Sequence, residues 1–466
     1  MTRSYGDDAP IAAFATSPGW SALTLIRCTG AGSPELAAAV FSAPGKLLQA
    51  AGNTVVHGWI VTANAKIDEV LVSVFRAPKS YTGEDGVDIC CHGGGAAGKG
   101  VMDALRAAGF HDALPGEFTF RAFMNGKLDL TRGESVMELV SARTDRGRHN
   151  AVSRLSGVLE TEINAIKKKL VEILSGVEVF LDYSEDEIGI DADEDAGRFT
   201  GLEPAREALA RLRMLAESWK RERIYQEGVL AVIAGRPNAG KSSLFNLLLK
   251  EERAIVTEVP GTTRDWIEAW VSIEGVPVRL ADTAGLRESL DPVEKIGVER
   301  SRDLLEAAEL VLYLIDGEAG FTAEDAAFIG ELKQKPHLII WNKVDLALPS
   351  ADNEIKECVC VSAKTGEGIA ALTSAIAAAI TTAINGEMGA RAETSPAALG
   401  TERQKNLVEA AAAALEEALA LAVREEPLDI IAPLLRDAIN SLGEITGEVS
   451  TADILEEMFG KFCVGK

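Results

Sequence analysis

A run of apolar residues that enters a glycine-rich turn and then a stretch of helical character occupies residues 229–246, and it constrains the fold more than any other feature. The pattern G-x-x-x-x-G-K-[ST] is met there by Gly235, Gly240, Lys241 and Ser242. Between a strand and a helix, such glycines let backbone N–H groups surround an anion, and the helix N-terminus adds partial positive charge. Lys241 reaches the β- and γ-phosphates, and the hydroxyl of Ser242 suits magnesium. The stretch therefore predicts a phosphate-binding loop.

Further nucleotide-binding elements follow in chain order. Asp282–Gly285 comes after an expected strand, which puts Asp282 near the metal and the N–H of Gly285 near a γ-phosphate. Asn342–Asp345 also ends an expected strand, and Ser362–Lys364 follows where a loop would close over the base. Together with the phosphate loop, these elements predict a GTP-binding domain.

The choice of GTP rests on Asp345. Its carboxylate accepts hydrogen bonds from N1–H and the exocyclic amine of guanine, donors that adenine does not offer in that arrangement. Leu286 stands directly after the Asp-x-x-Gly element, where signalling GTPases place a glutamine that orients water. Because leucine cannot align water, we expect hydrolysis to use another residue, another molecule or a metal ion.

The domain around these motifs is expected to be a doubly wound α/β sheet over residues 224–384, because apolar strands alternate there with helices. The expected strands are Val229–Ala234, Val278–Ala281, Leu310–Ile315, His337–Trp341 and Cys358–Val361.

The flanking segments have different patterns. Residues 10–108 mix short β-rich runs with two helical stretches, an α+β pattern. Residues 130–223 and the segment from Thr401 onward are helical, and 385–400 is an expected linker. The nucleotide domain is therefore expected to be inserted into a helical domain.

Composition limits the class of protein. The 466 residues suggest about three domains, and the formal net charge of −24 argues against a global basic field for nucleic acid. No apolar run approaches a membrane span, and acids stand where a secretion signal would be basic, so we expect a cytoplasmic protein. The six cysteines form no disulfide or zinc spacing.

Two segments leave alternatives open. Residues 115–130 interleave charges and aromatics without a regular period, which is typical of a polar pocket or of a domain junction. A basic stretch over residues 143–169 is either a local RNA contact or a solvated helix face, and we favour the solvated face. Its cations are Arg143, Arg146, Arg148, Arg154, Lys167, Lys168 and Lys169, with His149 among them.

The chain resembles the tRNA modification GTPase family MnmE, also called TrmE, over essentially its whole length. The segments that carry the resemblance are Gly235–Ser243, Gly261–Asp265, Asp282–Arg287, Pro115–Leu130 and Cys463–Lys466. Sister GTPases share the first three, whereas the last two and the inserted topology single out this family.

The resemblance implies an α/β multidomain protein with an α+β N-terminal domain that binds tetrahydrofolate and dimerises, residues 1–125. A helical domain would comprise residues 126–223 and 385–466, and a doubly wound P-loop GTPase domain, residues 224–384, would be inserted into it. The family is a homodimer that acts with a flavin-dependent partner on tRNA. It forms a carboxymethylaminomethyl or aminomethyl group on the wobble uridine, with the one-carbon unit from a tetrahydrofolate derivative.

The family's GTP and metal sites carry over to specific positions. The expected GTP-binding residues are Asn238, Ala239, Gly240, Lys241, Ser242, Ser243, Thr257, Glu258, Val259, Pro260, Gly261, Thr262, Thr263, Asp282, Thr283, Ala284, Gly285, Asn342, Lys343, Asp345, Ser362, Ala363 and Lys364. The resemblance implies a potassium site at Asn238, Thr257, Val259 and Thr262, and a magnesium site at Ser242 and Thr263. Lys241, Thr263 and Glu294 would be catalytic, with Glu294 orienting the water that Leu286 cannot.

For folate, the matching positions are Arg27, Glu84, Lys127 and Lys466. A carboxylate such as Glu84 suits the amide-and-amine edge of a pterin. The free thiol of Cys463 would be a nucleophile beside the folate or a packed tail residue.

Two other functions fit the GTP motifs. One is a ribosome-assembly GTPase that acts as a binding switch, although the acidic helical flank is a poor RNA-binding module. The other is a GTP-regulated scaffold whose N-terminal domain binds protein and no folate. Folate binding by residues 1–125 separates both from the tRNA-modification enzyme.

Overall fold

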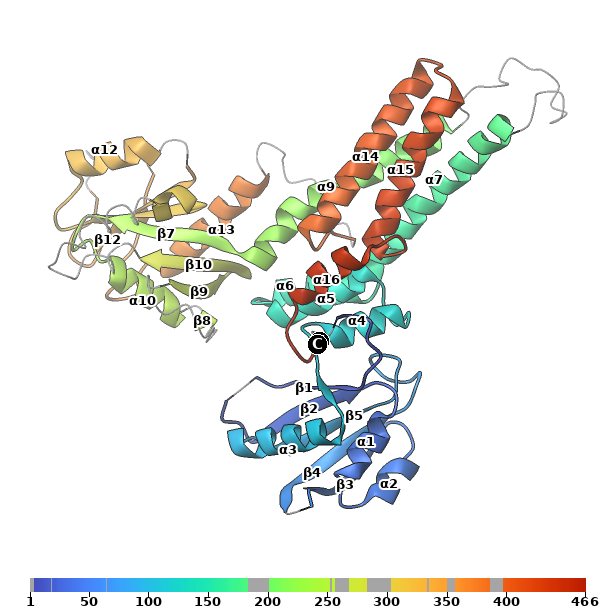
Figure 1. Cartoon of the computed structure of the whole chain (residues 1–466). Helices are drawn as coiled ribbons and strands as arrows, with labels where there is room; N and C mark the ends of the chain where they lie inside the picture. Colours follow the sequence, from blue (N-terminus) through green and yellow to red (C-terminus); the bar gives the residue numbers. More distant parts are fainter. Residues whose placement is uncertain are drawn as a thin grey trace. The chain divides into compact units, whose positions relative to one another are not determined.

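The computed structural model describes residues 4–17, 19–63, 65–182, 201–251, 254–255, 268–282, 303–332, 335–349, 357–385 and 397–466 (Figure 1). The chain forms two compact units. The first contains residues 1–137, 160–205 and 413–466, and the second contains residues 138–159 and 206–412. The α/β multidomain class expected from the sequence is confirmed.

The first unit contains a six-stranded sheet in the order β3-β4-β5-β2-β1-β6. All neighbouring strands are antiparallel except β1 and β6, which are parallel. The strands are β1 (Ile11–Phe14), β2 (Leu23–Thr29), β3 (Thr54–Val61), β4 (Lys66–Phe75), β5 (Gly86–His92) and β6 (His111–Asp112). Alternate residues of β4 are buried, as expected for a strand with one face on the core.

Helices α1 (Ser33–Ala39), α2 (Pro44–Gln49) and α3 (Gly95–Ala108) contribute to the core of this sheet. Leu47 of α2 and Leu105 of α3 are fully buried in one cluster with Ile26 and Ile89 of the strands. The same unit contains α4 (Glu117–Met124), α15 (Leu428–Thr446) and α16 (Ala452–Gly460). Phe459 of α16 packs edge-on against Phe120 of α4, with 5.6 Å between ring centroids.

Further helices are α5 (Leu130–Ser141), α6 (Asp145–Leu155), α7 (Val158–Asp182), α9 (Leu202–Glu227) and α14 (Glu402–Val423). Among the residues described here, no helix is long and apolar enough to cross a membrane.

The second unit contains a seven-stranded sheet in the order β13-β12-β11-β7-β10-β9-β8. Its strands are β7 (Val229–Gly235), β8 (Ala254–Ile255), β9 (Glu268–Ile273), β10 (Val276–Asp282), β11 (Leu310–Asp316), β12 (His337–Asn342) and β13 (Val359–Cys360). The strands from β13 to β10 run parallel, whereas β9 and β8 form an antiparallel edge. The central strands β7 and β11 are buried on both faces, which is why their sequences are continuously apolar.

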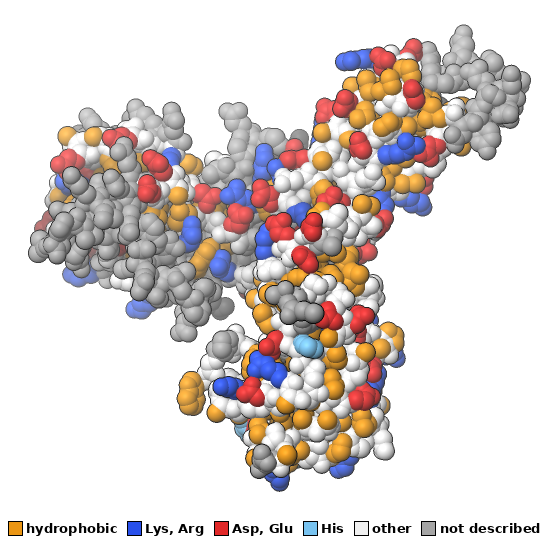
Figure 2. Space-filling model, viewed as in Figure 1, with side chains coloured by type: hydrophobic (Ala, Val, Ile, Leu, Met, Phe, Trp, Pro, Cys, Tyr) orange, Lys and Arg blue, Asp and Glu red, His pale blue; other side chains and the backbone are white. Residues whose placement is uncertain are grey.

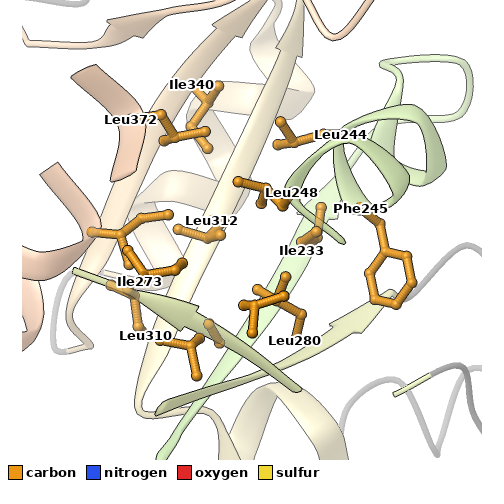
Figure 3. Packing of buried hydrophobic residues seen from close by; sticks show 14 of the residues in the cluster. Ile233, Leu244, Phe245, Leu248, Ile273, Leu280, Leu310, Leu312, Ile340 and Leu372 are labelled. Carbon is orange, nitrogen blue, oxygen red and sulfur yellow. The ribbon is translucent and has the colours of Figure 1, made fainter. Parts of the chain in front are cut away.

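Two apolar clusters cover the faces of this sheet. One joins Ile233 and Leu312 to helices α10 (Lys241–Glu251) and α13 (Ile369–Asn385), with Leu244 and Leu372 in the contact (Figure 3). The other joins Val232 and Tyr313 to residues of α12 (Ala323–Glu331). Because successive residues of a strand point to opposite faces, neighbours such as Val232 and Ile233 enter different cores.

The structure differs from the sequence prediction at several elements. Residues 117–124 form helix α4, although no helical period was found, because residues 117–122 are all buried and polar residues occupy core positions. The antiparallel strand β9 was not predicted beside the parallel ones. The run Gly93–Gly95 leads directly into α3, which begins at Gly95.

Candidate functional site

The phosphate loop lies between β7 and α10, as the motif predicts. Gly235 has φ +143°, and a Cβ there would lie 2.4 Å from the Leu314 carbonyl oxygen. Gly240 has φ +96°, and a Cβ there would lie 2.2 Å from Asn342 Nδ2. A side chain at Gly240 would displace Asn342 from the loop, so this glycine is required by close approach as well as by its backbone conformation.

Lys241 is the first residue of α10 and is only 8% exposed. Its ammonium group donates to the carbonyls of Gly235 and Arg236 at 2.9 and 2.8 Å. The amine is therefore held at the mouth of the loop by main-chain oxygens, in reach of the phosphates that the loop is built to bind.

The next residue, Ser242, donates a hydrogen bond to Asp282 at the end of β10, with 2.7 Å between Oγ and Oδ2. Asp282 is 3% exposed. A hydroxyl and a carboxylate are the hard oxygen groups that magnesium prefers, and they converge here from two elements. These residues fit a magnesium ion.

The two loops that are expected to contact the base meet beside the phosphate loop. Asn342 Nδ2 donates to the Ala239 carbonyl at 2.7 Å, and its Oδ1 accepts from the N–H of Ala363 at 3.0 Å. Ser362 Oγ donates to Asp345 Oδ1 at 2.7 Å. Asn342 therefore ties the phosphate loop to the loop that contains Ser362, and Ser362 orients the carboxylate expected to read guanine.

Lys343, whose φ is +65°, pairs with Asp316 at the end of β11, with 2.7 Å between Nζ and Oδ2. Burial alone would raise the pKa of Asp316, but the hydrogen bond from Lys343 and those from two backbone N–H groups outweigh it, and the pKa is lowered. Sequence reasoning missed Asp316. The available signal is that Asp316 ends β11, the strand that follows β10 in the chain, just as Asp282 ends β10.

Other expected residues have less definite surroundings. Asn238, Ser243 and Lys364 are exposed, and Asn238 has φ +64° in the left-handed region. The expected residues Thr257–Thr263, Thr283–Gly285 and Glu294 lie outside the residues that the structure describes.

A second candidate site lies in the first unit around Arg27 of β2. Its guanidinium donates to the Gly465 carbonyl at 3.4 Å and pairs with Asp88 at 3.5 Å on the adjacent strand β5. The same group lies over the rings of Tyr81 and Phe118, 5.5 and 5.9 Å from their centroids. Burial raises the pKa of Asp88, although Arg27 opposes the shift.

These residues line a cavity of about 70 Å³. Its lining consists of Arg27, Cys28, Thr29, Phe75, Ser80, Tyr81, Thr82, Gly86, Asp88 and Phe118. The buried Ser80 Oγ has no hydrogen-bond partner in the described part of the protein. Aromatic walls, an arginine, a carboxylate and an unsatisfied hydroxyl are the kinds of group that bind a polar ring such as a pterin.

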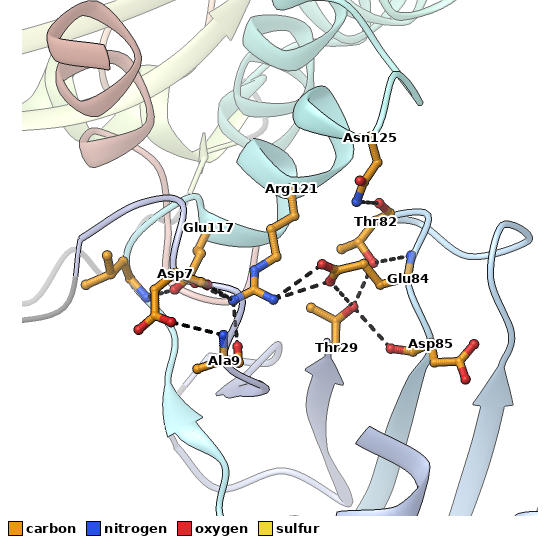
Figure 4. A network of polar contacts seen from close by, with 10 residues as sticks. Asp7, Ala9, Thr29, Thr82, Glu84, Asp85, Glu117, Arg121 and Asn125 are labelled. Carbon is orange, nitrogen blue, oxygen red and sulfur yellow. Dashed lines mark hydrogen bonds and ion pairs between the residues drawn. The ribbon is translucent and has the colours of Figure 1, made fainter. Parts of the chain in front are cut away.

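Glu84 belongs to a buried polar network beside this cavity (Figure 4). Its carboxylate accepts from Thr29 Oγ1 at 2.9 Å and lies 3.4 Å from Arg121 Nη1. Arg121 in turn pairs with the 1%-exposed Glu117 at 2.8 Å and donates to the Ala9 carbonyl at 2.8 Å. The sequence predicted Glu84 as a site residue but not Arg121. Arg121 lies in the segment Pro115–Leu130, which carries part of the family resemblance.

The other expected folate positions are brought near this network by the backbone. Lys127 donates to the Pro78 carbonyl at 2.9 Å, and its side chain packs over Gly83 beside Glu84. The C-terminal residues pack on β1, where a Cβ at Gly465 would lie 2.4 Å from the Phe14 carbonyl oxygen. This places Lys466 directly after the residue that Arg27 contacts, whereas Cys463 is exposed.

The basic stretch is a solvated helix face in part, because Arg146, Arg148, His149 and Lys168 are exposed as expected, whereas Arg154 is buried. Arg154 is 3% exposed and pairs with Glu138 at 2.6 Å and with Glu222 at 3.0 Å. The guanidinium of Arg143 stacks on Trp270, 3.6 Å from the ring centroid, and that of Arg146 lies over Tyr225. Figure 2 shows Lys and Arg interspersed with Asp and Glu on the face in view, without a continuous basic area among the coloured residues.

Comparison with known proteins gives two family matches. Residues 10–127 match the model "GTP-binding protein TrmE N-terminus", and residues 130–463 match the model "MnmE helical domain". A protein of Treponema denticola named tRNA modification GTPase MnmE is 42% identical, with 99% of this chain and 99% of the relative covered. A protein of the same name from Carboxydothermus hydrogenoformans is 40% identical, with 98% and 99% covered. Among solved structures, Era of Aquifex aeolicus shares 28% identity over 32% of this chain and 55% of that chain, with a TM-score of 0.26.

Proposed function

The chain belongs to the MnmE family of tRNA modification GTPases, and from this we propose that its potassium-dependent GTPase cycle drives a folate-dependent modification of the tRNA wobble uridine. That it binds and hydrolyses GTP and takes part in tRNA modification follows from the family itself. The proposed reaction, carried out with a flavin-dependent partner, attaches a carboxymethylaminomethyl or aminomethyl group. A tetrahydrofolate derivative supplies the one-carbon unit.

The observation that carries the folate proposal is the surroundings of Arg27. Its guanidinium lies against two aromatic rings and the carboxylate of Asp88 at one cavity, and it also donates to the Gly465 carbonyl. Such a group recognises a planar, polar ring by stacking and by hydrogen bonds at its edge. Glu84 and Lys127 would add a carboxylate and an amine at the rim.

For hydrolysis, Lys241 would contact the β- and γ-phosphates, and Ser242 with Thr263 and Asp282 would hold magnesium. Asn238, Thr257, Val259 and Thr262 offer the oxygen atoms that would hold potassium. A cation there supplies positive charge where other GTPases use an arginine finger. Glu294 would orient the attacking water.

We further propose that the protein works as a homodimer in the cytoplasm, with the flavin-dependent protein and tRNA as partners. The net charge of −24 supports tRNA contacts that are local or shared with that partner.

The test is tetrahydrofolate binding by the full chain, measured calorimetrically for Arg27→Gln and for a matched control, Arg76→Gln. Arg76 pairs with Asp85 at 3.3 Å, is 29% exposed against 22% for Arg27, and does not line the cavity. We expect Arg27→Gln to weaken binding by roughly tenfold or more, since a charged contact contributes about 1.5–3 kcal/mol, and Arg76→Gln to change it less than twofold.

Failure of the parent chain to bind tetrahydrofolate would refute the folate proposal and favour the ribosome-assembly switch or the scaffold. Equal losses of tetrahydrofolate affinity in the two variants would show that the binding site does not lie at Arg27.

A further inference from the structure

Arg236, the residue after the first glycine of the phosphate loop, sends its side chain to helix α12. Its Nε forms an ion pair with Asp325 Oδ1 at 3.3 Å without a hydrogen bond to any described residue, and its Nη2 donates to the Gly320 carbonyl at 3.4 Å. The Arg236 side chain is 24% exposed and that of Asp325 is fully buried. The loop is therefore connected to the element that follows β11 by a side chain as well as by the sheet.

Asp325 itself is fixed by other groups. Its Oδ1 accepts from Tyr313 Oη at 2.8 Å, while its Oδ2 accepts from the N–H and the hydroxyl of Thr322 at 2.9 and 2.7 Å. Thr322 and Asp325 form the capping box at the start of α12. A carboxylate with this many donors has one orientation, so it is a rigid anchor for the guanidinium.

The main chain of Arg236 contacts the lysine of the phosphate loop. Its carbonyl accepts from Lys241 Nζ at 2.8 Å, beside the Gly235 carbonyl. The contacts therefore run in sequence from Asp325 to the Arg236 guanidinium, then through the Arg236 backbone to the ammonium group that meets the phosphates.

We propose that Arg236 and Asp325 are positioning residues for GTP hydrolysis, which hold the first turn of the phosphate loop so that Lys241 meets the β-phosphate. Neither residue touches the nucleotide. A charged group displaced by about 1 Å loses much of its effect on a bound phosphate, so the anchor contributes to affinity and rate through Lys241.

A role in folding alone predicts a different result. Loss of fold stability would affect all guanine nucleotides alike, whereas loosening the phosphate loop affects only nucleotides that carry a β-phosphate. GMP has the same base and sugar as GDP but lacks that phosphate. The ratio of the GMP and GDP dissociation constants therefore isolates the contribution of the loop.

The experiment measures both dissociation constants by calorimetry, with magnesium, for the full chain and for Arg236→Gln, Asp325→Asn and the double variant. We expect each single variant to weaken GDP binding by roughly tenfold with GMP binding changed less than twofold, and the double variant to lose no more than either single. Tyr313→Phe removes one of the three hydrogen bonds that orient the carboxylate but leaves the ion pair and both hydrogen bonds from Thr322, so its GMP-to-GDP ratio should change less than that of Arg236→Gln. If Asp325→Asn does not fold, the ratio of GMP and GDP dissociation constants in Arg236→Gln and Tyr313→Phe still tests the proposal.

An unchanged ratio in Arg236→Gln, equal losses of GMP and GDP, or additive losses in the double variant would overturn the proposal. So would a Tyr313→Phe variant with the same change in ratio as Arg236→Gln.

Discussion

The hydroxyl of Ser242 donates to the carboxylate of Asp282 across 2.7 Å, which joins the first turn of α10 to the end of β10. The contact holds the serine oxygen beside a second hard oxygen group and gives its lone pairs a fixed direction. A residue that orients a metal ligand in this way typically changes metal affinity by 10- to 100-fold when it is replaced.

Asp282→Asn should therefore raise the magnesium concentration that gives half-maximal GTP hydrolysis by roughly tenfold, because the amide cannot replace the carboxylate. A magnesium titration at saturating GTP measures it. Asp316→Asn is the matched control, since Asp316 also ends a parallel strand but pairs with Lys343. The same shift in both variants would show that Asp282 has no special relation to magnesium.

Asp345→Asn should exchange a preference for GTP for a preference for XTP, because the amide presents a donor toward guanine N1–H. A polar mismatch with the base costs a large factor, and we expect discrimination to change by roughly 100-fold or more in a competition assay. Ser362→Ala removes the 2.7 Å hydrogen bond to Asp345 and keeps the carboxylate, so it should retain the GTP preference. An Asp345→Asn variant that still prefers GTP would show that this residue does not face the base.

Hydrolysis of GTP should rise strongly in potassium and hardly in sodium, because the expected site is a set of oxygens suited to the larger ion. Asn238→Ala should remove this effect and largely retain nucleotide binding. Since Asn238 has φ +64°, Ala adds backbone strain there, and Asn238→Gly removes the same oxygen without it. The measurement is the rate of GTP hydrolysis in matched potassium and sodium salts. Equal rates for the parent protein would contradict the proposed potassium site.

Glu294→Ala should bind GTP and bring the GTPase domains together, yet hydrolyse GTP slowly and fail to support tRNA modification. The expected reason is coupling: potassium at the proposed site would be held in part by residues 257–262, and the facing copy in the proposed dimer would complete that site. Normal hydrolysis by this variant would refute the catalytic role of Glu294. Slow hydrolysis with normal modification would refute the coupling.

Glu160→Gln should stabilise the protein at neutral pH. A hydrogen bond with Asp129 raises the pKa of Glu160, burial and repulsion by Asp129 add to the shift, and Arg132 opposes it. Because this pKa is raised, Glu160 stabilises the folded protein fully below its ordinary pKa of 4.5. This stabilisation is lost as the pH rises through the pKa of the folded protein. Glutamine stays neutral at every pH, so the variant does not lose this stability at neutral pH.

We expect the melting temperature of Glu160→Gln to exceed that of the parent by roughly 1–3 °C at pH 7.5, with the difference disappearing near pH 4. Glu172→Gln, at a 65%-exposed position of the same helix, is the control. A difference that does not depend on pH would show that the carboxyl pair is not its origin.

The nucleotide loops could be predicted because each is a contiguous run whose residues act on one ligand. Lys241, Ser242 and Asp282 lie where the motif puts them, since a strand end fixes the direction of the residues that follow it. Asp325 could not be predicted, because nothing in the sequence around it indicates that its carboxylate meets an arginine of the loop.

Buried charges were the main failure of sequence reasoning. Arg154 stands among other cations in the sequence, but its partners Glu138 and Glu222 come from 16 residues before and 68 residues after it. Arg121 and Glu117 belong to six consecutive buried residues of one helix, so no polar face marks its period. Such pairs depend on which distant segments meet, and local pattern carries no signal of that.

The hydrogen bond from Arg27 to the Gly465 carbonyl joins residues 438 positions apart. A ribosome that adds about 5–20 residues per second makes Gly465 roughly 20–90 s after Arg27. Until then Arg27 lacks this acceptor, however early β1 and β2 pair. A chain released before this point keeps the whole GTPase sheet but leaves Arg27 without the Gly465 carbonyl, so this contact forms only in a chain synthesised through residue 465.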